Sequence, residues 1–113
     1  MMTNVKSNEE YQKCIDICLD CAQVCEFCVT SCLNEADPKE MAYCIKLDRD
    51  CADICILAAQ FMARDSIFSK RICLICAQIC RACGEECAKF SQDHCQNCAD
   101  ICNDCATECE KMK

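Results

Sequence analysis

The chain contains no tryptophan, and glycine, proline and histidine occur only once each among its 113 residues. Small disulfide-knotted scaffolds depend on glycine and proline turns, so the scarcity of both argues against that class. No apolar stretch is long enough to span a membrane. The polar start, MMTNVKSNEEYQKC, also lacks the apolar segment of a secretory signal. We therefore expect a cytoplasmic protein with free thiols and no membrane partner.

Signatures of catalysis are equally scarce. The sequence shows no serine, histidine and aspartate grouping, no glycine-rich phosphate loop and no evident pair of catalytic carboxylates. These absences disfavour an enzyme. The formal net charge of −7 disfavours nucleic acid as a partner, because phosphate binding needs a basic surface.

Cysteine, in contrast, supplies 19 of the residues. In residues 14–32, CIDICLDCAQVCEFCVTSC, six cysteines follow one another at steps of four, three, four, three and four. Side chains at these spacings lie on one face of an α-helix. In an ordinary bundle that face would carry leucine, isoleucine or valine packed in the core. The spacing therefore predicts a helix whose buried face is made of thiols.

The same period continues along the chain, since fifteen of the eighteen steps between successive cysteines are three, four or seven residues. Candidate helix caps and breaks separate the repeats. They are Ser7 or Asn8, Asn34 with Asp37 and Pro38, Asp65 or Ser66, and Ser91. We expect a flexible leader over residues 1–7 and a single domain over 8–113, with helices at about 8–34, 38–63, 66–90 and 92–112.

Four helices of similar length joined by short connections favour an all-α fold, an antiparallel up-down-up-down bundle with a cysteine-lined core. Gly84, on a flank of the third cysteine face, should allow close approach of two helices. The second helix is the least regular. Its inner positions are Met41, Cys44, Asp48, Cys51, Cys55, Ala58 and Met62. Asp48 is either a hydrated residue in a wide part of the channel or a weak ligand, and we favour hydration.

A core of thiols predicts binding of soft metal ions, and charge selects the ion. A buried thiolate without a counter-charge is costly, so the empty core must hold neutral thiols and release protons as metal enters. Zn(II) with four thiolates carries a net charge of −2, and several such sites in one dry channel would repel one another. Cu(I) accepts two or three soft ligands, and about one ion per thiolate leaves no excess charge. The sequence therefore predicts storage and sequestration of multiple Cu(I) ions, about one per cysteine.

The two ends of the predicted bundle differ. One end gathers a mixed set of side chains: Cys32, Met41, Cys44, Cys87, His94 and Cys95. The other gathers Cys14, Met62, Cys73, Cys109 and Met112, with Tyr11, Phe61, Ile67 and Phe68 as a candidate plug. We expect copper to enter by the first end, where His94 and Met41 are candidate ligands. The alternatives are a solvated His94 and a Met41 that only fills the core.

This cysteine pattern resembles that of the cytosolic copper storage proteins, from about Cys14 to Cys109. The resemblance implies a four-helix bundle, a homotetramer and many Cu(I) ions held by inward-facing cysteines. The metal ligands that it implies are Cys14, Cys18, Cys21, Cys25, Cys28, Cys32, Cys44, Cys51, Cys55, Cys73, Cys76, Cys80, Cys83, Cys87, Cys95, Cys98, Cys102, Cys105 and Cys109. A copper chaperone or a low-molecular-weight thiol is the kind of donor that such a protein would use.

Two other functions stay open at this point. A general thiolate buffer for Zn(II) or Cd(II) is compatible with partial loading. An iron–sulfur electron carrier fits less well, because cluster ligands usually come from one compact loop and a distant cysteine. Apolar residues outside the cysteine faces also predict a homo-oligomer; they are Leu19, Phe27, Tyr43, Ile56, Leu57, Leu74 and Ile75.

Overall fold

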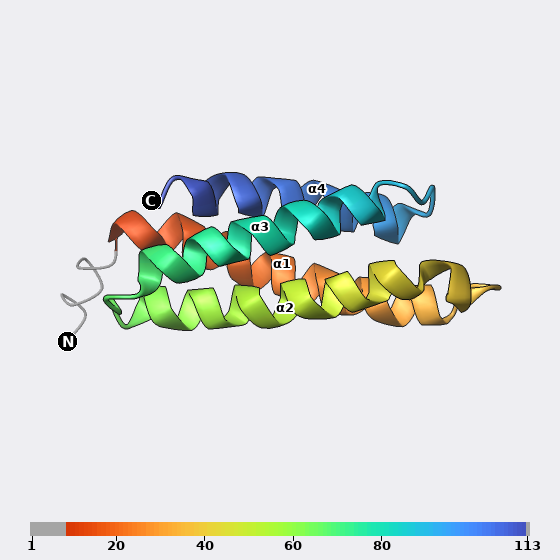
Figure 1. Ribbon diagram of the computed structural model, residues 1–113, viewed down its shortest axis with the longest axis horizontal. Coiled ribbons are helices and arrows are strands. Elements are labelled where there is room, and N and C mark those ends of the chain that lie inside the picture. Colours follow the sequence, from red (N-terminus) through yellow and green to blue (C-terminus); the bar gives the residue numbers. More distant parts are fainter. Residues whose placement is uncertain (1–8, 113) are drawn as a thin grey trace.

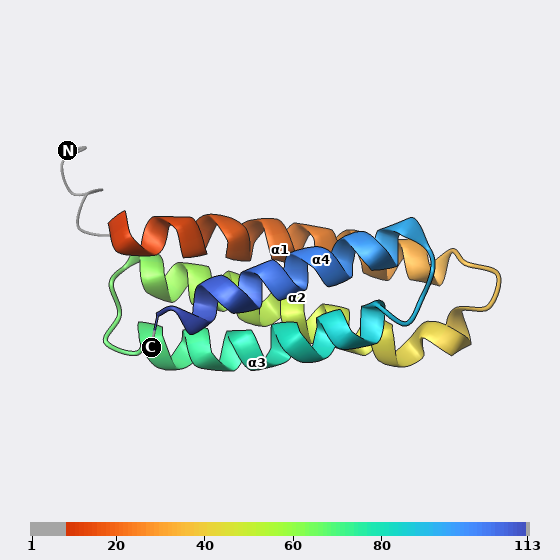
Figure 2. The same cartoon turned by 90° about the horizontal axis from the view of Figure 1, so that it is seen from above.

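The computed structural model describes residues 9–112, which fold into four long helices and one short 3₁₀ helix, with no strand in that range. The elements are α1 (Glu9–Leu33), η2 (Pro38–Met41), α2 (Ala42–Ala63), α3 (Ser69–Cys87) and α4 (Asp93–Glu110). Figures 1 and 2 show the helices side by side and alternating in direction. The predicted all-α, up-down-up-down bundle is confirmed. No helix in residues 9–112 is long and apolar enough to cross a membrane.

Contacts between consecutive helices, and between α1 and α4, close the bundle around one core. The connections α1–α2 and α3–α4 lie at one end, which we call the His94 end, and the α2–α3 connection lies at the other, the Tyr11 end (Figure 2). All nineteen cysteines have no solvent exposure. Small residues beside the cysteine faces let the helices approach closely; among them are Ala22, Ala52, Ala77, Ala99 and Ala106, each at most 4% exposed.

The helix ends differ from the predictions in detail. The segment after Pro38 first forms a 3₁₀ turn, so α2 begins at Ala42 rather than near residue 38. The side chain of Asp37 makes no capping hydrogen bond there. Ser91 was the expected cap of α4, yet Gln92 takes that position, also without a side-chain capping bond. The candidate caps Ser7 and Asn8, and the leader over residues 1–7, lie outside the described residues.

The turn after α2 corrects another prediction, because Asp65 ends α2 and does not start α3. Its φ of 53° is left-handed. The backbone N–H of Asp65 donates to the carbonyl of Met62, and that of Ser66 donates to the carbonyl of Phe61. These two bonds define a Schellman motif, which satisfies carbonyls at the end of a helix. The hydroxyl of Ser69 also donates to the carbonyl of Phe61, at 3.1 Å, and ties α3 to the same turn.

Gly84 lies at a close approach of two helices, as the sequence predicted, and the helices are α3 and α4. A Cβ at this position would lie 2.9 Å from Oδ1 of Asn103 and 3.3 Å from the backbone oxygen of Ala99. The Asn103 side chain is exposed and can move, but the Ala99 carbonyl is part of α4 and cannot move without its helix. The missing side chain therefore sets the distance between α3 and α4.

We expect Gly84→Val to lower the free energy of unfolding of the metal-free protein by about 1–3 kcal/mol, because the branched side chain overpacks this contact. Gly84→Ala should change stability much less, since Asn103 can rotate away and alanine gains about 1 kcal/mol of helix propensity. Chemical denaturation under reducing conditions, followed by circular dichroism, measures both. Equal stability of the valine and alanine variants would contradict a tight α3–α4 contact.

Candidate metal centre

The thiols of α1 face those of α4 along the whole length of the two helices. Their Sγ atoms lie 3.6 Å apart for Cys14 and Cys109 and 3.7 Å apart for Cys18 and Cys105. Nearer the His94 end, the Sγ atoms of Cys25 and Cys98 are also 3.7 Å apart. The α1–α4 interface is therefore a ladder of sulfur contacts.

Helices α2 and α3 form a second ladder. The Sγ–Sγ distance is 3.5 Å for Cys51 and Cys80, and 3.6 Å for Cys55 and Cys76. Cys51 joins the two ladders, because its sulfur lies 3.8 Å from those of both Cys21 and Cys102. All nineteen cysteines are free thiols. The core is thus one continuous column of unbonded sulfur.

Several groups of four ligand atoms in this column lie within 4.8 Å of one another, the reach of a single metal ion. Three of them follow one another along the axis: Cys18, Cys76, Cys105 and Cys109; Cys21, Cys25, Cys51 and Cys102; and Cys25, Cys83, Cys98 and Cys102. The first set lies nearest the Tyr11 end. Because Cys25 and Cys102 belong to two sets, a thiolate there can bridge neighbouring ions.

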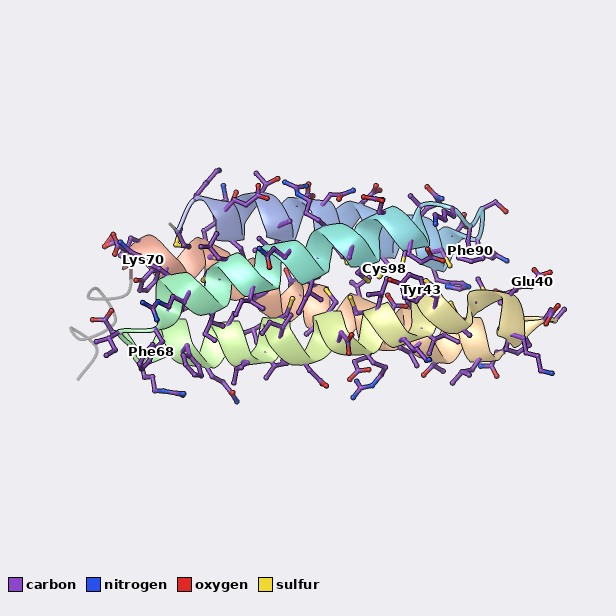
Figure 3. The ribbon with its side chains drawn as sticks, in the orientation of Figure 1. Glu40, Tyr43, Phe68, Lys70, Phe90 and Cys98 are labelled. Atoms are coloured by element: carbon purple, nitrogen blue, oxygen red, sulfur yellow. The ribbon has the colours of Figure 1, made fainter. Side chains whose placement is uncertain are left out.

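Asp48 overturns one prediction, since it is fully buried among the thiols and is not hydrated from an open channel. Its Oδ1 accepts S–H hydrogen bonds from Cys83 and Cys98, each at 3.1 Å, and from Cys87 at 3.4 Å. Burial, followed by repulsion from Cys98, raises the pKa of the Asp48 carboxyl to about 8. A carboxylate in an apolar core needs hydrogen-bond donors, and here the thiols supply them. Figure 3 places Cys98 between the helices, toward the end that holds Tyr43 and Phe90.

His94, the single histidine, faces thiols at the His94 end of the bundle. The side chain of His94 is 13% exposed, and its Nδ1 lies 3.5 Å from the sulfur of Cys95 and 3.6 Å from that of Cys28. Its Nε2 lies 2.8 Å from Oε2 of Glu35. The ring of His94 is thus only partly exposed and faces the sulfurs at this end of the column, which disfavours the alternative of a fully solvated histidine. Glu35 was missed, because a carboxylate 59 positions away gives no sequence signal.

The end residues otherwise agree in part with the predictions. Met41 is 2% exposed in η2, Met62 is fully buried, and Tyr43 is 60% exposed, as expected. At the Tyr11 end, Tyr11 is buried. Ile67 is 91% exposed and Phe68 is 49% exposed, so these two do not plug the bundle as predicted. Figure 3 shows Phe68 and Lys70 at this end, away from Tyr43 and Phe90.

Burial favours the protonated form of two thiols at the His94 end when no metal is present. Removal from water raises the pKa of the Cys95 thiol to about 11, and it raises the pKa of Cys32 as well. Cys32 and Cys95 therefore stay neutral near pH 7. Metal binding must then expel protons from the core.

We expect the metal-free protein to lose stability as the pH rises from about 4 to about 8, partly through Asp48. Its carboxyl has an ordinary pKa of 3.8 and a pKa of about 8 in the fold. The folded state therefore keeps a proton that the unfolded state releases, and this contribution is complete below pH 4 and is lost as the pH approaches 8. Asp48→Asn, which cannot titrate, should flatten the dependence of the melting temperature on pH between about 4.5 and 7.5.

The matched control is Asp100→Asn, which removes an exposed carboxyl from α4. This variant should keep the pH dependence of the unsubstituted chain. Thermal unfolding with reductant and chelator present measures all three proteins. A dependence that Asp48→Asn leaves unchanged would contradict the buried, protonated carboxyl.

The fold and this core define a class: a helical bundle that gives its interior to soft-metal ligands. A family model described as copper storage protein (Csp) matches residues 7–113. The chain belongs to the copper storage protein family. That family is one of storage proteins and not of known enzymes.

Individual relatives agree with the family match. The chain is 51% identical over 87 residues to the uncharacterized cysteine-rich protein YhjQ of Bacillus subtilis (strain 168), covering 76% of this chain and 81% of YhjQ. The Cu(I)-bound structure of the Bacillus subtilis copper storage protein BsCsp3 is 50% identical, with a TM-score of 0.88, and the match covers 91% of this chain and 97% of that one. A cytosolic copper storage protein from Streptomyces lividans, in a structure with five coppers, is 35% identical, with a TM-score of 0.89 and coverages of 93% and 92%.

Proposed function

We propose that this protein stores and sequesters Cu(I) in the cytosol, with the nineteen cysteines of the core as ligands at about one ion per thiol. The continuous sulfur column carries this proposal. Its nineteen cysteines are fully buried and free, and many of their sulfurs lie within 4.0 Å of another sulfur, as in the pairs Cys14–Cys109 and Cys51–Cys80. Relatives at 50% and 35% identity, whose structures contain Cu(I) or several coppers, support the same function.

Charge explains why a monovalent ion suits this core. Each Cu(I) that replaces a thiol proton leaves the net charge of the column unchanged. Four thiolates around Zn(II) would instead add a charge of −2 for each site. Because the four-cysteine sets share residues and follow one another along one dry axis, those charges would repel one another strongly. A thiolate buffer filled with Zn(II) or Cd(II) is therefore disfavoured. The copper-containing structures of relatives at 50% and 35% identity also disfavour an iron–sulfur carrier.

Anaerobic titration of the reduced protein with Cu(I) tests this function directly. We expect the ultraviolet thiolate-to-copper absorbance to rise linearly and to break near the cysteine count of 19. Cys51→Ser, which removes one of the thiols that join the two ladders, should lower the break by about one to two ions. The control Ser31→Ala, on the outer part of α1, should not change it. A break at a quarter of the thiol count would contradict Cu(I) storage.

The His94 end is the proposed entrance for copper. His94 and Glu35 are partly exposed there, whereas Tyr11 and Met62 are buried at the other end. Met41 lies in the same region and would act as a further soft ligand or as a core filler. His94→Ala should slow uptake of the first Cu(I) ions in stopped-flow absorbance and change the final capacity by no more than about one ion. Equal slowing by Met112→Leu, at the other end, would contradict a single entrance.

Apolar side chains outside the core support self-association, with a homotetramer as the proposed state. Leu19, Phe27, Ile56, Leu57, Leu74 and Ile75, on α1, α2 and α3, are between 37% and 65% exposed. Among residues 9–112, α4 presents no large exposed apolar side chain of this kind. Leu19 and Ile56 line one groove between α1 and α2.

A copper chaperone or a low-molecular-weight thiol is the proposed donor of Cu(I) to this protein.

We expect Ile56→Lys to lower the molar mass measured by light scattering after gel filtration, because association over the groove between α1 and α2 would bury a charge. Asn97→Lys adds the same charge to the exposed face of α4 and serves as the control, which should keep the mass of the unsubstituted protein. A monomer in all three cases would contradict the oligomer.

A further inference from the structure

One cluster of possible metal ligands at the end of the bundle combines thiols with an imidazole nitrogen. At the His94 end, the sulfurs of Cys28, Cys32 and Cys95 and the Nδ1 of His94 all lie within 4.8 Å of one another. Farther along the column, the four-residue groups described above consist of thiols alone. Three thiolates and one imidazole are a donor set typical of tetrahedral zinc.

Five of the six distances between ligand atoms in this cluster are close to those of a zinc tetrahedron, and the sixth, between the sulfurs of Cys28 and Cys95, is within 4.8 Å. With Zn–S bonds of about 2.3 Å and a Zn–N bond of about 2.0–2.1 Å, sulfur atoms must lie about 3.8 Å apart and sulfur and nitrogen about 3.5 Å apart. The Sγ–Sγ distances are 3.8 Å for Cys28–Cys32 and 3.9 Å for Cys32–Cys95. Nδ1 of His94 lies 3.5 Å, 3.6 Å and 3.9 Å from the sulfurs of Cys95, Cys28 and Cys32. Small side-chain adjustments are enough to close this shell on an ion.

Glu35 prepares the histidine for this role. Its carboxylate can only accept a hydrogen bond, so the contact of 2.8 Å to Nε2 of His94 places the ring proton on Nε2. The lone pair of the neutral ring is then on Nδ1, which faces the three sulfurs. Carboxylate, histidine and zinc in this order form a recurrent arrangement, in which the carboxylate fixes the ring and raises its basicity.

Charge and access also separate this cluster from the deeper column. Zn²⁺ with three thiolates and a neutral imidazole carries a net charge of −1, whereas Zn²⁺ with four thiolates carries −2. The side chains of His94 and Glu35 are 13% and 33% exposed, so water at the end of the bundle can solvate this charge and an ion can enter. A single divalent ion here avoids the repulsion that disfavours a stack of them.

We propose that Cys28, Cys32, His94 and Cys95 form a specific site for one Zn²⁺ ion per chain. Binding converts three neutral thiols to thiolates and releases three protons, and His94 contributes its Nδ1 lone pair without losing a proton. This site holds one ion at the end of the column, whereas a zinc buffer would hold ions along the whole column. The proposal does not depend on copper storage.

A consequence does rest on the proposed copper function. Because the zinc ligands are the thiols at the copper entrance, a bound Zn²⁺ ion closes that entrance. Copper must displace it before reaching the deeper thiols. Protein preloaded with one Zn²⁺ should therefore take up Cu(I) with a lag and release one Zn²⁺ early in the titration. If the lag is absent, only the closing of the entrance is contradicted. The zinc site itself is tested by a titration with Zn²⁺.

The test is a titration of the reduced, metal-free full chain with Zn²⁺ against a chromophoric chelator, repeated with Co²⁺ as a spectroscopic probe. We expect one tight equivalent per chain, and a tetrahedral Co²⁺ spectrum with thiolate charge-transfer bands. Cys32→Ser and His94→Ala should each abolish the tight equivalent. Glu35→Gln should weaken zinc binding by about 10–100-fold, because it weakens the hydrogen bond to Nε2.

The matched control is Glu108→Gln, which makes the same change at a carboxylate paired with Lys13 and Lys111, far from His94. It should leave zinc affinity unchanged. A tight equivalent that survives His94→Ala, a stoichiometry near a quarter of the thiols, or octahedral Co²⁺ on surface carboxylates would each overturn the proposal. Circular dichroism of every variant checks that the helices are intact.

A measurement on the unsubstituted chain keeps the test independent of variant folding. One equivalent of ¹¹³Cd²⁺ should give a single resonance in the range of three thiolates and one nitrogen, with a coupling to the ring of His94. A resonance in the range of four thiolates, without that coupling, would place the divalent ion among the deeper cysteines and overturn the site.

Discussion

Burial of nineteen thiols along one axis is the constraint on which the structure depends. A neutral thiol packs as a small apolar group with only a weak hydrogen bond, so the metal-free bundle can exclude water from it without burying charge. The same atom becomes a strong soft-metal ligand once its proton leaves. Packing and the proposed metal binding therefore use the same side chains. Stabilisation that leucine would normally supply falls to the small and β-branched residues beside the cysteine faces.

Asp48 is an exception in this core, because it places a carboxyl group among the buried thiols. A carboxyl in this core keeps its proton or accepts hydrogen bonds from thiols, and here three sulfurs lie within 3.4 Å of Oδ1. Its position between the deeper column and the His94 end divides the core into an all-thiol part and a part with oxygen and nitrogen donors nearby. The fold tolerates the carboxyl because its neighbours can donate.

The period of the cysteines predicted the helices, the bundle and the residues of the core, because side chains three and four positions apart share a face whatever their chemistry. Local polar signals predicted less. Asp37 and Ser91 look like caps in the sequence, yet neither caps a helix through its side chain, since packing of the thiol faces decides where the chain turns. The burial of Asp48 and the Glu35–His94 pair depend on partners from other helices, which a periodic pattern cannot identify. The ligand role of each cysteine follows from chemistry that the pattern suggests and only metal binding can test.

In the proposed copper core and zinc site, the gradient of solvation along the axis accounts for the different treatment of two kinds of ion. Deep in the column, among fully buried sulfurs, only an ion that replaces one proton with one positive charge preserves neutrality. At the His94 end, a partly exposed imidazole and carboxylate let water share the residual charge of a divalent complex. Selectivity for the metal then follows from depth as well as from ligand type. Moving the histidine one helical turn deeper would remove its contact with Glu35 and with solvent, and the site would lose its ability to carry a net charge.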